Sequence, residues 1–252
     1  MCRTLAILLA STLAIAHGHQ ATTQDVAIDP DDIGGVVTGP KGPEAGVWVI
    51  AETRDLPVRF IRIVVTDDRG RYVVPDLPRA SYSVWARGYG LVDGAKVTAK
   101  PGAQVNLTAT PAKDAAAAAQ YYPAIYWYSM LKIPAADRFG SSDGLPANFT
   151  QTDWLNAMKS NGCVGCHQMG QLSTRSIPQA FGTFSSSVDA WRHRVQAGQS
   201  GQMMLAQMTA LGPLAFQHFA DWTDRIADGE LPQATPSRPQ GLERNIVVTL
   251  RD

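Results

Sequence analysis

The sequence is short of cysteine, of net charge and of long apolar runs, and each shortage narrows the functions open to the chain. Three cysteines in 252 residues leave no second cysteine pair for a structural zinc site. The 22 basic and 22 acidic residues balance, and loss of a segment containing Arg3 leaves 21 basic against 22 acidic residues. The chain therefore lacks the excess of positive charge that is typical of nucleic-acid-binding proteins. The apolar run at residues 5–16 is shorter than the roughly 18 residues that span a bilayer, so no membrane span is expected.

The N-terminus has the layout of a secretory signal. Arg3 provides a charged start, residues 5–16 an apolar core, and Ala14-Ile15-Ala16 a small-x-small cleavage site. We therefore expect residues 1–20 to be a signal peptide and the mature protein to be periplasmic, with a retained membrane anchor as the alternative. Cys2 precedes the apolar core, whereas a lipid-attachment cysteine would follow it, so Cys2 is expected to leave with the signal.

The two remaining cysteines, Cys163 and Cys166, lie three positions apart in the stretch SNGCVGCHQMG. A disulfide between them would close too small a loop to add much stability. A zinc site would have only His167, His193 and His218 to complete its ligands. A thioredoxin-like redox pair opens a helix directly after a strand, whereas the preceding stretch TDWLNAMKSNG predicts a helix.

Covalent haem is the interpretation that uses every residue of the CxxCH motif. Each thiol adds to one vinyl group, a spacing of three puts both sulfur atoms on one side of a helical turn, and the adjacent His167 is placed to bind the iron. One haem c is therefore predicted on Cys163 and Cys166, with His167 as the proximal ligand. A redox pair or a fortuitous motif is the alternative.

The residues around the motif predict a helical shell. A helix is expected at residues 151–159, capped by Thr152 or Asp153, with an apolar side formed by Trp154, Leu155 and Met158. Pro178 follows His167 by eleven residues, and its backbone carbonyl is a candidate acceptor for the Nδ1 proton of His167. Four further side chains are candidate hydrogen-bond partners for the haem carboxylates: Trp191, Arg175, Arg192 and Arg194. The alternative is that the tryptophan belongs to the core and that the arginines form a solvated face.

The order of helix, CxxCH, proline loop, helix, methionine and final helix resembles the class I cytochromes c over residues 151–231. This resemblance implies an all-α domain with a methionine ahead of the last helix as the distal ligand. Here QSGQMMLAQMTALG precedes a helix that Pro213 opens and Gly229 ends. By comparison with the family we expect Met204 to be the distal ligand. The alternatives are Met203 and Met208, the histidines His193 and His218, or methionines that only fill the core.

Residues 33–110 change to short alternating segments that Gly, Pro and Asp interrupt, which indicates an antiparallel β-sandwich. The segments are GGVVTG, GVWVIAE, FIRIVVTDD, GRYVVPDL, SYSVWARGYG, AKVTAK and QVNLTAT. Gly70 is expected to turn a hairpin, with Tyr72 and Tyr82 in the core. Turn chemistry rather than calcium accounts for the DDRG stretch.

The stretches GVVT (35–38), TDDRGRY (66–72), ASY (80–82) and RGY (87–89) resemble the carboxypeptidase regulatory-like domain. That resemblance implies a prealbumin-like sandwich over residues 28–112 without chemistry of its own. Residues 113–150 form an aromatic-rich linker in which Asp114 caps a helix of alanines and Pro123 interrupts it. Because its tyrosines and Trp127 favour burial, we expect them to pack within the molecule rather than to form a partner surface.

The tail, residues 232–252, is expected to run extended through three prolines and to end in a strand, NIVVTL, with nothing after it to pair with. Such a strand needs a cover, so we expect it to join a partner's sheet. The chain as a whole resembles longer bacterial proteins that continue into a virginiamycin B lyase-like β-propeller. The features that carry this resemblance are the sandwich, the aromatic linker, the CxxCH segment and the stretch ADWTDRIADGELP. Because the sequence stops at Asp252, this implies either a shortened chain or a separate propeller chain as redox partner.

These patterns predict a two-domain periplasmic protein with an N-terminal antiparallel β-sandwich and a C-terminal all-α cytochrome c domain. Methionine ligation raises the potential and keeps the iron six-coordinate, which favours single-electron transfer to or from a partner protein over catalysis. The sandwich would then be a docking module. The alternatives are a haem enzyme or sensor with an open distal site, and a binding module with an auxiliary haem.

Overall fold

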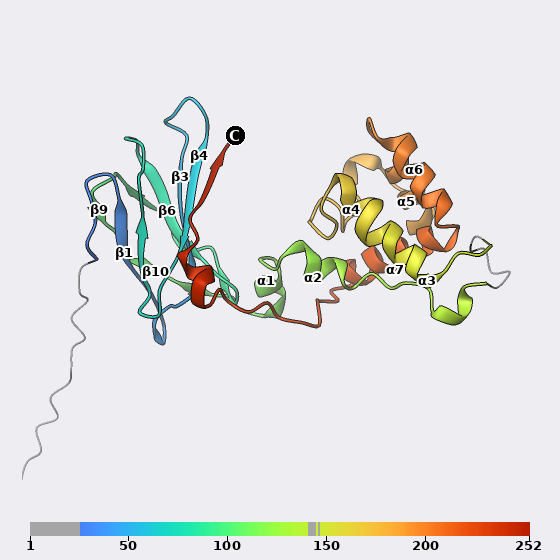
Figure 1. The fold of residues 1–252 in the computed structure, drawn as a ribbon, viewed down its shortest axis with the longest axis horizontal. Coiled ribbons are helices and arrows are strands. Elements are labelled where there is room, and N and C mark those ends of the chain that lie inside the picture. The colour runs from blue at the N-terminus through green and yellow to red at the C-terminus, as the bar shows by residue number, and fades with distance from the viewer. Residues whose placement is uncertain (1–25, 141–144, 146) are drawn as a thin grey trace, which may run out of the picture.

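The computed structural model describes residues 26–140, 145 and 147–252, and the expected signal peptide with Arg3 and Cys2 lies outside them. Figure 1 shows a sheet-rich N-terminal part and a helical C-terminal part, which we call the β unit (residues 26–111) and the helical unit (residues 147–231). This arrangement agrees with two domains. No helix in the described part of the chain is long and apolar enough to cross a membrane.

The β unit contains two main sheets. Its strands are β1 (Ile33–Gly39), β2 (Gly42–Pro43), β3 (Trp48–Thr53), β4 (Phe60–Val65), β5 (Arg71–Val74), β6 (Tyr82–Arg87), β7 (Leu91–Val92), β8 (Val97–Ala99), β9 (Ala103–Gln104), β10 (Leu107–Thr108) and β11 (Thr110–Pro111). The expected antiparallel pairing is correct for β3 with β4 and β6, and for β1 with β2 and β5. It is wrong for β9 and β10, which pair parallel to β1, because the chain crosses back to this sheet in the direction of β1.

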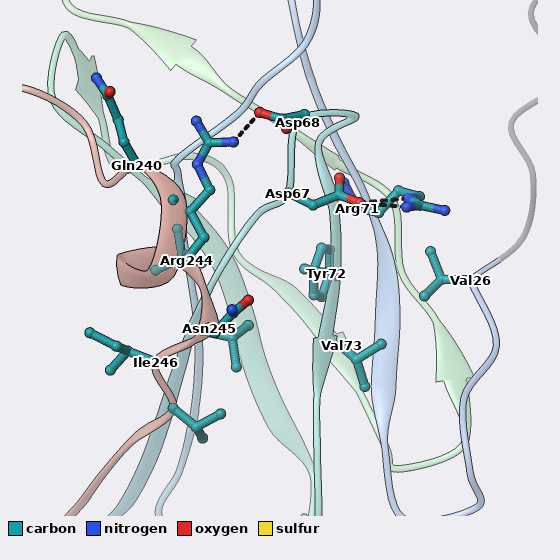
Figure 2. Close-up of a pocket in the computed structure, with 14 residues that line it drawn as sticks. Val26, Asp67, Asp68, Arg71, Tyr72, Val73, Gln240, Arg244, Asn245 and Ile246 are labelled. Atoms are coloured by element: carbon teal, nitrogen blue, oxygen red, sulfur yellow. Dashed lines mark hydrogen bonds and ion pairs between the residues drawn. The ribbon is translucent and has the colours of Figure 1, made fainter.

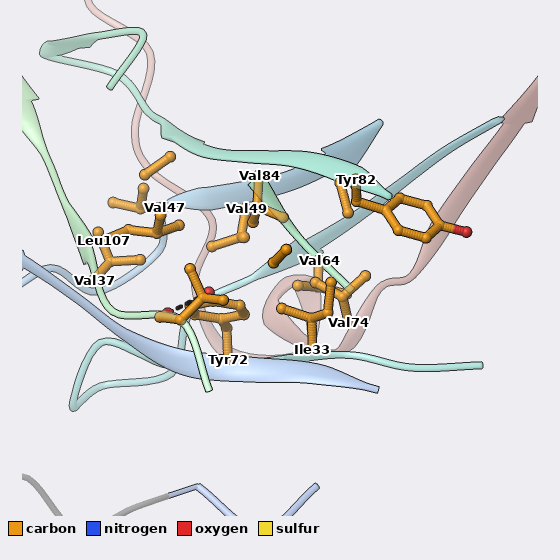
Figure 3. Packing of buried hydrophobic residues seen from close by; sticks show 14 of the residues in the cluster. Ile33, Val37, Val47, Val49, Val64, Tyr72, Val74, Tyr82, Val84 and Leu107 are labelled. Carbon is orange, nitrogen blue, oxygen red and sulfur yellow. Dashed lines mark hydrogen bonds between the residues drawn. The ribbon is translucent and has the colours of Figure 1, made fainter. Parts of the chain in front are cut away.

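The core of the β unit lies between these sheets (Figure 3). Alternate residues of each strand point inward, as the period of two requires, and β1 contributes Ile33 and Val37 while β3 contributes Val49. Tyr72 and Tyr82 are buried as predicted, and each hydroxyl donates to a backbone carbonyl, of Val105 at 2.6 Å and of Pro78 at 2.9 Å. Burial raises the pKa of Tyr72 because the phenolate would be desolvated.

The chain turns at Gly70 between β4 and β5, with a φ of 72° that a side chain would strain. The predicted hairpin is wrong, because β4 pairs with β3 and β12 whereas β5 pairs with β1 in the other sheet. The Asp67 carboxylate accepts from the backbone N–H of Arg69 and of Arg71, both at 2.8 Å, and pairs with the Arg71 guanidinium. The Asp67 carboxylate therefore stabilises the turn through these three contacts.

The aromatic linker packs against both units. Asp114 caps α1 (Ala115–Ala119) by accepting from the N–H of Ala117 at 2.7 Å, as predicted. Helix α1 ends before Pro123, which agrees with the predicted interruption, and a second helix, α2 (Ala124–Tyr128), begins directly after it. On the β unit, the Tyr121 hydroxyl accepts from the N–H of Asp93 at 3.1 Å, and the Tyr122 ring lies 6.3 Å from that of Tyr89.

Toward the helical unit, the linker inserts its two buried aromatic residues, Trp127 and Tyr128. The Trp222 indole donates to the Trp127 carbonyl at 2.9 Å, and the Tyr128 hydroxyl donates to the Met158 carbonyl at 2.9 Å. The prediction of intramolecular packing is confirmed for these rings.

The helical unit consists of α3 (Gln151–Asn156), the π-helical turn η2 (Ala157–Asn161), α4 (Cys163–Cys166), η3 (Gln179–Phe181), α5 (Ser187–Gln196), α6 (Gly201–Ala210) and α7 (Leu214–Ala227). The final helix has Pro213 at its start and Gly229 just past its end, as predicted. Its buried face includes Phe216, Phe219 and Trp222, which pack with Trp154 from α3.

The start of α3 differs from the prediction. Thr150, not Thr152 or Asp153, is the N-cap, and it forms a capping box in which Asp153 is the third helical residue. Of the predicted apolar side, Trp154 and Met158 are buried and Leu155 is half-buried. The helix then widens into η2, and such π-turns are frequent at functional sites. The expected single helix at 151–159 is therefore two segments that lead into α4.

The tail returns to the β unit, which corrects the prediction that its strand joins a partner's sheet. Strand β12 (Val248–Arg251) pairs antiparallel with β4, with Leu250 opposite Ile61. Strand propensity predicts that this segment is a strand, but it does not predict which sheet edge the strand will join. The structural argument for a separate β-propeller chain is lost with this correction.

Side chains hold the tail in place before it reaches β12. Arg238 donates to Glu44 at 2.5 Å and to the carbonyl of Tyr89 at 3.0 Å. In η4 (Gly241–Asn245), Arg244 pairs with Asp68 across a cavity of about 620 Å³ between the tail and the turn that joins β4 to β5 (Figure 2). The β unit and helical unit are therefore joined twice, by the linker and by the tail.

Two proline substitutions test the pairing of β12. Arg59 and Asp252 exchange both backbone hydrogen bonds, at 2.9 and 3.2 Å, so alternation places the N–H of Leu250 toward β4 and that of Thr249 toward the open edge. We expect Leu250→Pro to lower the free energy of unfolding by about 1–2 kcal/mol through the lost ladder bond.

Thr249→Pro is the backbone control, since it removes an N–H that faces away from β4. Thr249→Val corrects for the hydroxyl that accepts from Arg62 at 3.2 Å. Urea unfolding followed by tryptophan fluorescence measures all three variants. Equal stability of the two proline variants would contradict the register of β12.

Candidate functional site

A cavity of about 500 Å³ in the helical unit brings the motif and the candidate distal ligands together. Its walls include both cysteines, His167 and the three methionines of α6, together with Met169, Gln171, Ser173, Thr174, Phe181, Trp191, Arg194, Val195, Gln207 and Phe219. The volume falls within the roughly 300–1,000 Å³ of cofactor sites. The sequence motif and the methionines, about 40 positions apart along the chain, therefore face one space.

Helix α4 sets the positions of the two thiols. Cys163 is half-buried and its sulfur lies 4.0 Å from that of Met158, whereas Cys166 is exposed. Both are free thiols in this structure. Burial raises the pKa of the Cys163 thiol because the thiolate would lose hydration. His167 leaves the helical conformation, with φ −157° and ψ 157°, and its side chain is exposed.

The three methionines of α6 differ in exposure. Met208 is 3% exposed and packs in the helical core, Met204 is half-buried, and Met203 is 59% exposed. All three line the cavity, so the structure keeps all three as candidates. Met169 is buried in the same wall, next to the motif.

The alternative histidine ligands do not line this cavity. His193 is exposed on α5 and its ring lies 5.2 Å from those of Phe181 and Phe184. His218 packs 6.0 Å from the Trp154 ring, and burial lowers the pKa of its imidazole. Neither histidine is among the residues that line the cavity.

Pro178 does not line the cavity either. Its carbonyl accepts from the N–H of Phe181 at 3.0 Å, and among the described residues no hydrogen bond joins it to His167. A role for Pro178 in orienting His167 therefore stays a prediction.

The candidate partners for haem carboxylates already have partners in the protein. Trp191 donates to the Thr223 hydroxyl at 3.0 Å, and Arg192 pairs with Asp189 at 3.2 Å. Arg194 lines the cavity while donating to the carbonyls of Ser176 and Ser173. For Trp191 the structure supports the core interpretation.

Arg175 has a structural role that its sequence context did not reveal. It is only 7% exposed, its guanidinium lies 3.9 Å from the centre of the Trp127 ring, and it donates to the carbonyl of Gly170 at 2.8 Å. Gly170 has a φ of 92°, and a Cβ there would lie 2.0 Å from the carbonyl oxygen of Ala124. This close approach lets α2 rest on the loop that follows the motif.

Comparison with known proteins adds nothing to this geometry. No family model matches the chain, and no curated protein matches it.

The two thiols are expected to differ in reactivity in protein produced without haem. Cys166 should be alkylated by iodoacetamide several-fold faster than Cys163, because Cys163 is less accessible and its raised pKa leaves less thiolate. The difference should narrow as pH rises through the Cys163 pKa.

Mass spectrometry of Cys163→Ser and Cys166→Ser measures each thiol separately. Faster alkylation of Cys163 would contradict the burial described above.

Proposed function

We propose that this protein is a periplasmic single-electron carrier with one haem c attached at Cys163 and Cys166. The observation that supports the proposal is that both cysteines, His167 and three methionines line one cavity. The other three interpretations of a CxxC pair each leave His167 or the methionines without a role. In this proposal the helical unit resembles a class I cytochrome c, and the β unit a carboxypeptidase regulatory-like domain.

The residues present fit this group. The thiols are unpaired, Cys163 is half-buried and Cys166 is exposed, and both line the cavity. The walls carry Phe181, Trp191 and Phe219, which suit a large aromatic ring. No Asp or Glu is among the lining residues, so the walls place no acidic group against the propionates.

When bound, haem supplies reversible one-electron chemistry at iron, and this chain's residues set its environment. His167 offers an imidazole nitrogen on one side, and Met204 on α6 offers a thioether sulfur. A thioether ligand raises the potential relative to a second imidazole. We favour Met204 because Met203 is mostly exposed and Met208 is enclosed in the helical core.

The double connection between the units supports a docking role for the β unit. The linker and the tail both contact the β unit, through Tyr121 and Arg238 respectively. A redox partner bound to the β unit would therefore be held at a limited range of positions relative to the cavity. This role for the β unit rests on the carrier function and does not require chemistry in the β unit.

Covalent attachment is tested by haem staining after denaturing electrophoresis. We expect a stained band from a bacterial host that attaches haem to exported proteins, because thioether bonds survive denaturation. Cys163→Ser with Cys166→Ser should abolish the stain. An unstained band from the unchanged chain, in a host that stains a control cytochrome, would overturn the proposal.

The distal ligand is tested by substituting each methionine. We expect Met204→Ala to lower the reduction potential and to let carbon monoxide bind the reduced protein. Met203→Ala is the matched control on the adjacent exposed position and should behave like the unchanged chain.

Met208→Ala should instead cost about 2–5 kcal/mol of stability by leaving a core cavity. If the unchanged chain already binds carbon monoxide, the distal site is open and the enzyme or sensor alternative is favoured. If only Met203→Ala or Met208→Ala opens it, the assignment of Met204 is wrong.

A further inference from the structure

The part of the chain that builds the main cavity has an excess of positive charge, although the formal charge of the whole chain is zero. All residues that line the cavity fall between positions 154 and 220, where the sequence has four basic residues and one acidic residue, Asp189. The Asp189 carboxylate already accepts from Arg192 at 3.2 Å and from two serine hydroxyls. The other three basic residues are Lys159, which is exposed, Arg175 and Arg194.

Arg175 is buried beside the cavity with neutral partners. It is 7% exposed, and its guanidinium lies 3.9 Å from the centre of the Trp127 ring. It also donates to the carbonyl of Gly170 at 2.8 Å. Among the residues that the structure describes, no carboxylate forms an ion pair with Arg175. Because the preceding residue, Thr174, lines the cavity, this buried charge adjoins the cavity wall.

Arg194 lines the cavity itself and has the same kinds of partner. Its guanidinium lies 5.1 Å from the centre of the Trp191 ring and donates to the carbonyls of Ser173 and Ser176. No carboxylate in the described part of the chain pairs with it. Burial lowers the pKa of both guanidinium groups, yet arginine stays protonated in proteins. Rings and carbonyls stabilise these two charges without cancelling them.

A fixed positive charge beside a cavity favours negative charge inside it. The attraction is stronger there than in water, because the effective dielectric constant near buried groups is lower. Reduction of haem iron adds one electron, so a positive potential stabilises the reduced state relative to the oxidised state. Pairing of an arginine with a haem carboxylate does not change this sign, because loss of the arginine still removes a positive charge.

We propose that Arg175 and Arg194 together hold the cavity at a positive potential, which makes the haem of the proposed function easier to reduce. The effect on haem rests on the proposed function. The positive potential belongs to the protein itself and needs no haem. Two measurements therefore test the two parts of the inference separately.

In the full chain produced without haem, the two thiols report on the potential because both line the cavity. The probes are iodoacetate, which is anionic, and iodoacetamide, which is neutral. At one pH the ratio of their alkylation rates reports the local potential, since the thiolate fraction affects both rates equally. We expect Arg175→Gln and Arg194→Gln each to lower this ratio about threefold at low salt. The difference should shrink at high salt, because salt screens the charges.

Arg175→Lys and Arg194→Lys are the matched controls, because they keep the charge and change only the shape of the cation. Their rate ratios should stay close to that of the unchanged chain. Arg79→Gln controls for net charge, since Arg79 is exposed in the β unit, and it should also leave the ratio unchanged.

In the haem-loaded chain, redox titration compares the same variants. We expect Arg175→Gln and Arg194→Gln to lower the reduction potential, and the two Lys variants and Arg79→Gln to retain it. If Arg175→Gln does not fold because it loses its contacts with Trp127 and Gly170, Arg194→Gln provides the test, since Arg194 is only half-buried.

An unchanged rate ratio in the Gln variants would overturn the positive potential. Equal shifts in the Gln and Lys variants would contradict it as well, because the arginines would then act through geometry rather than charge. A lowered ratio in a chain that takes no haem stain would support the potential and remove its effect on haem. A stained chain whose reduction potential is the same in the Gln variants would refute that effect.

Discussion

The packing of Trp127 is the constraint on which the rest of the helical unit depends. Its indole N–H donates to the carbonyl of Ala119 at 3.2 Å, its own carbonyl accepts from Trp222, and its ring carries the guanidinium of Arg175. One buried residue therefore connects the linker, the last helix and the loop that follows the motif, through its side chain and its backbone carbonyl. Because Arg175 in turn holds the Gly170 carbonyl, the position of the CxxCH segment is tied to a residue that lies outside the helical unit.

Local signals in the sequence predicted much of the fold. Period-two segments marked most strands of the β unit, Asp114 and Pro123 marked the linker helices, and Pro213 with Gly229 bounded α7. These features are encoded within a few residues of where they act, through caps, fixed φ angles and alternation. For the candidate site, the spacing of the motif and the run of methionines were enough to predict residues that the structure brings to one cavity.

Features that depend on distant parts of the chain were not predictable in this way. The pairing of β12 with β4 joins residues about 190 positions apart, and the parallel pairs of β1 depend on how the chain crosses between sheets. The neighbouring residues do not predict the burial of Arg175 against Trp127, because an arginine among serines is ordinarily expected to be exposed to solvent. The observed cap, Thr150, lies two or three positions before the expected Thr152 or Asp153, since all three polar residues satisfy the same capping rule.

The return of the tail makes the β unit discontinuous in sequence, with the helical unit inserted between β11 and β12. An edge strand that follows the insertion cannot join its sheet until the insertion has been synthesised. Because loop-closure entropy grows only slowly with length, an insertion of this size adds little to the cost of pairing β12 with β4. The outer sheet of the β unit can therefore be completed only after the helical unit has been synthesised.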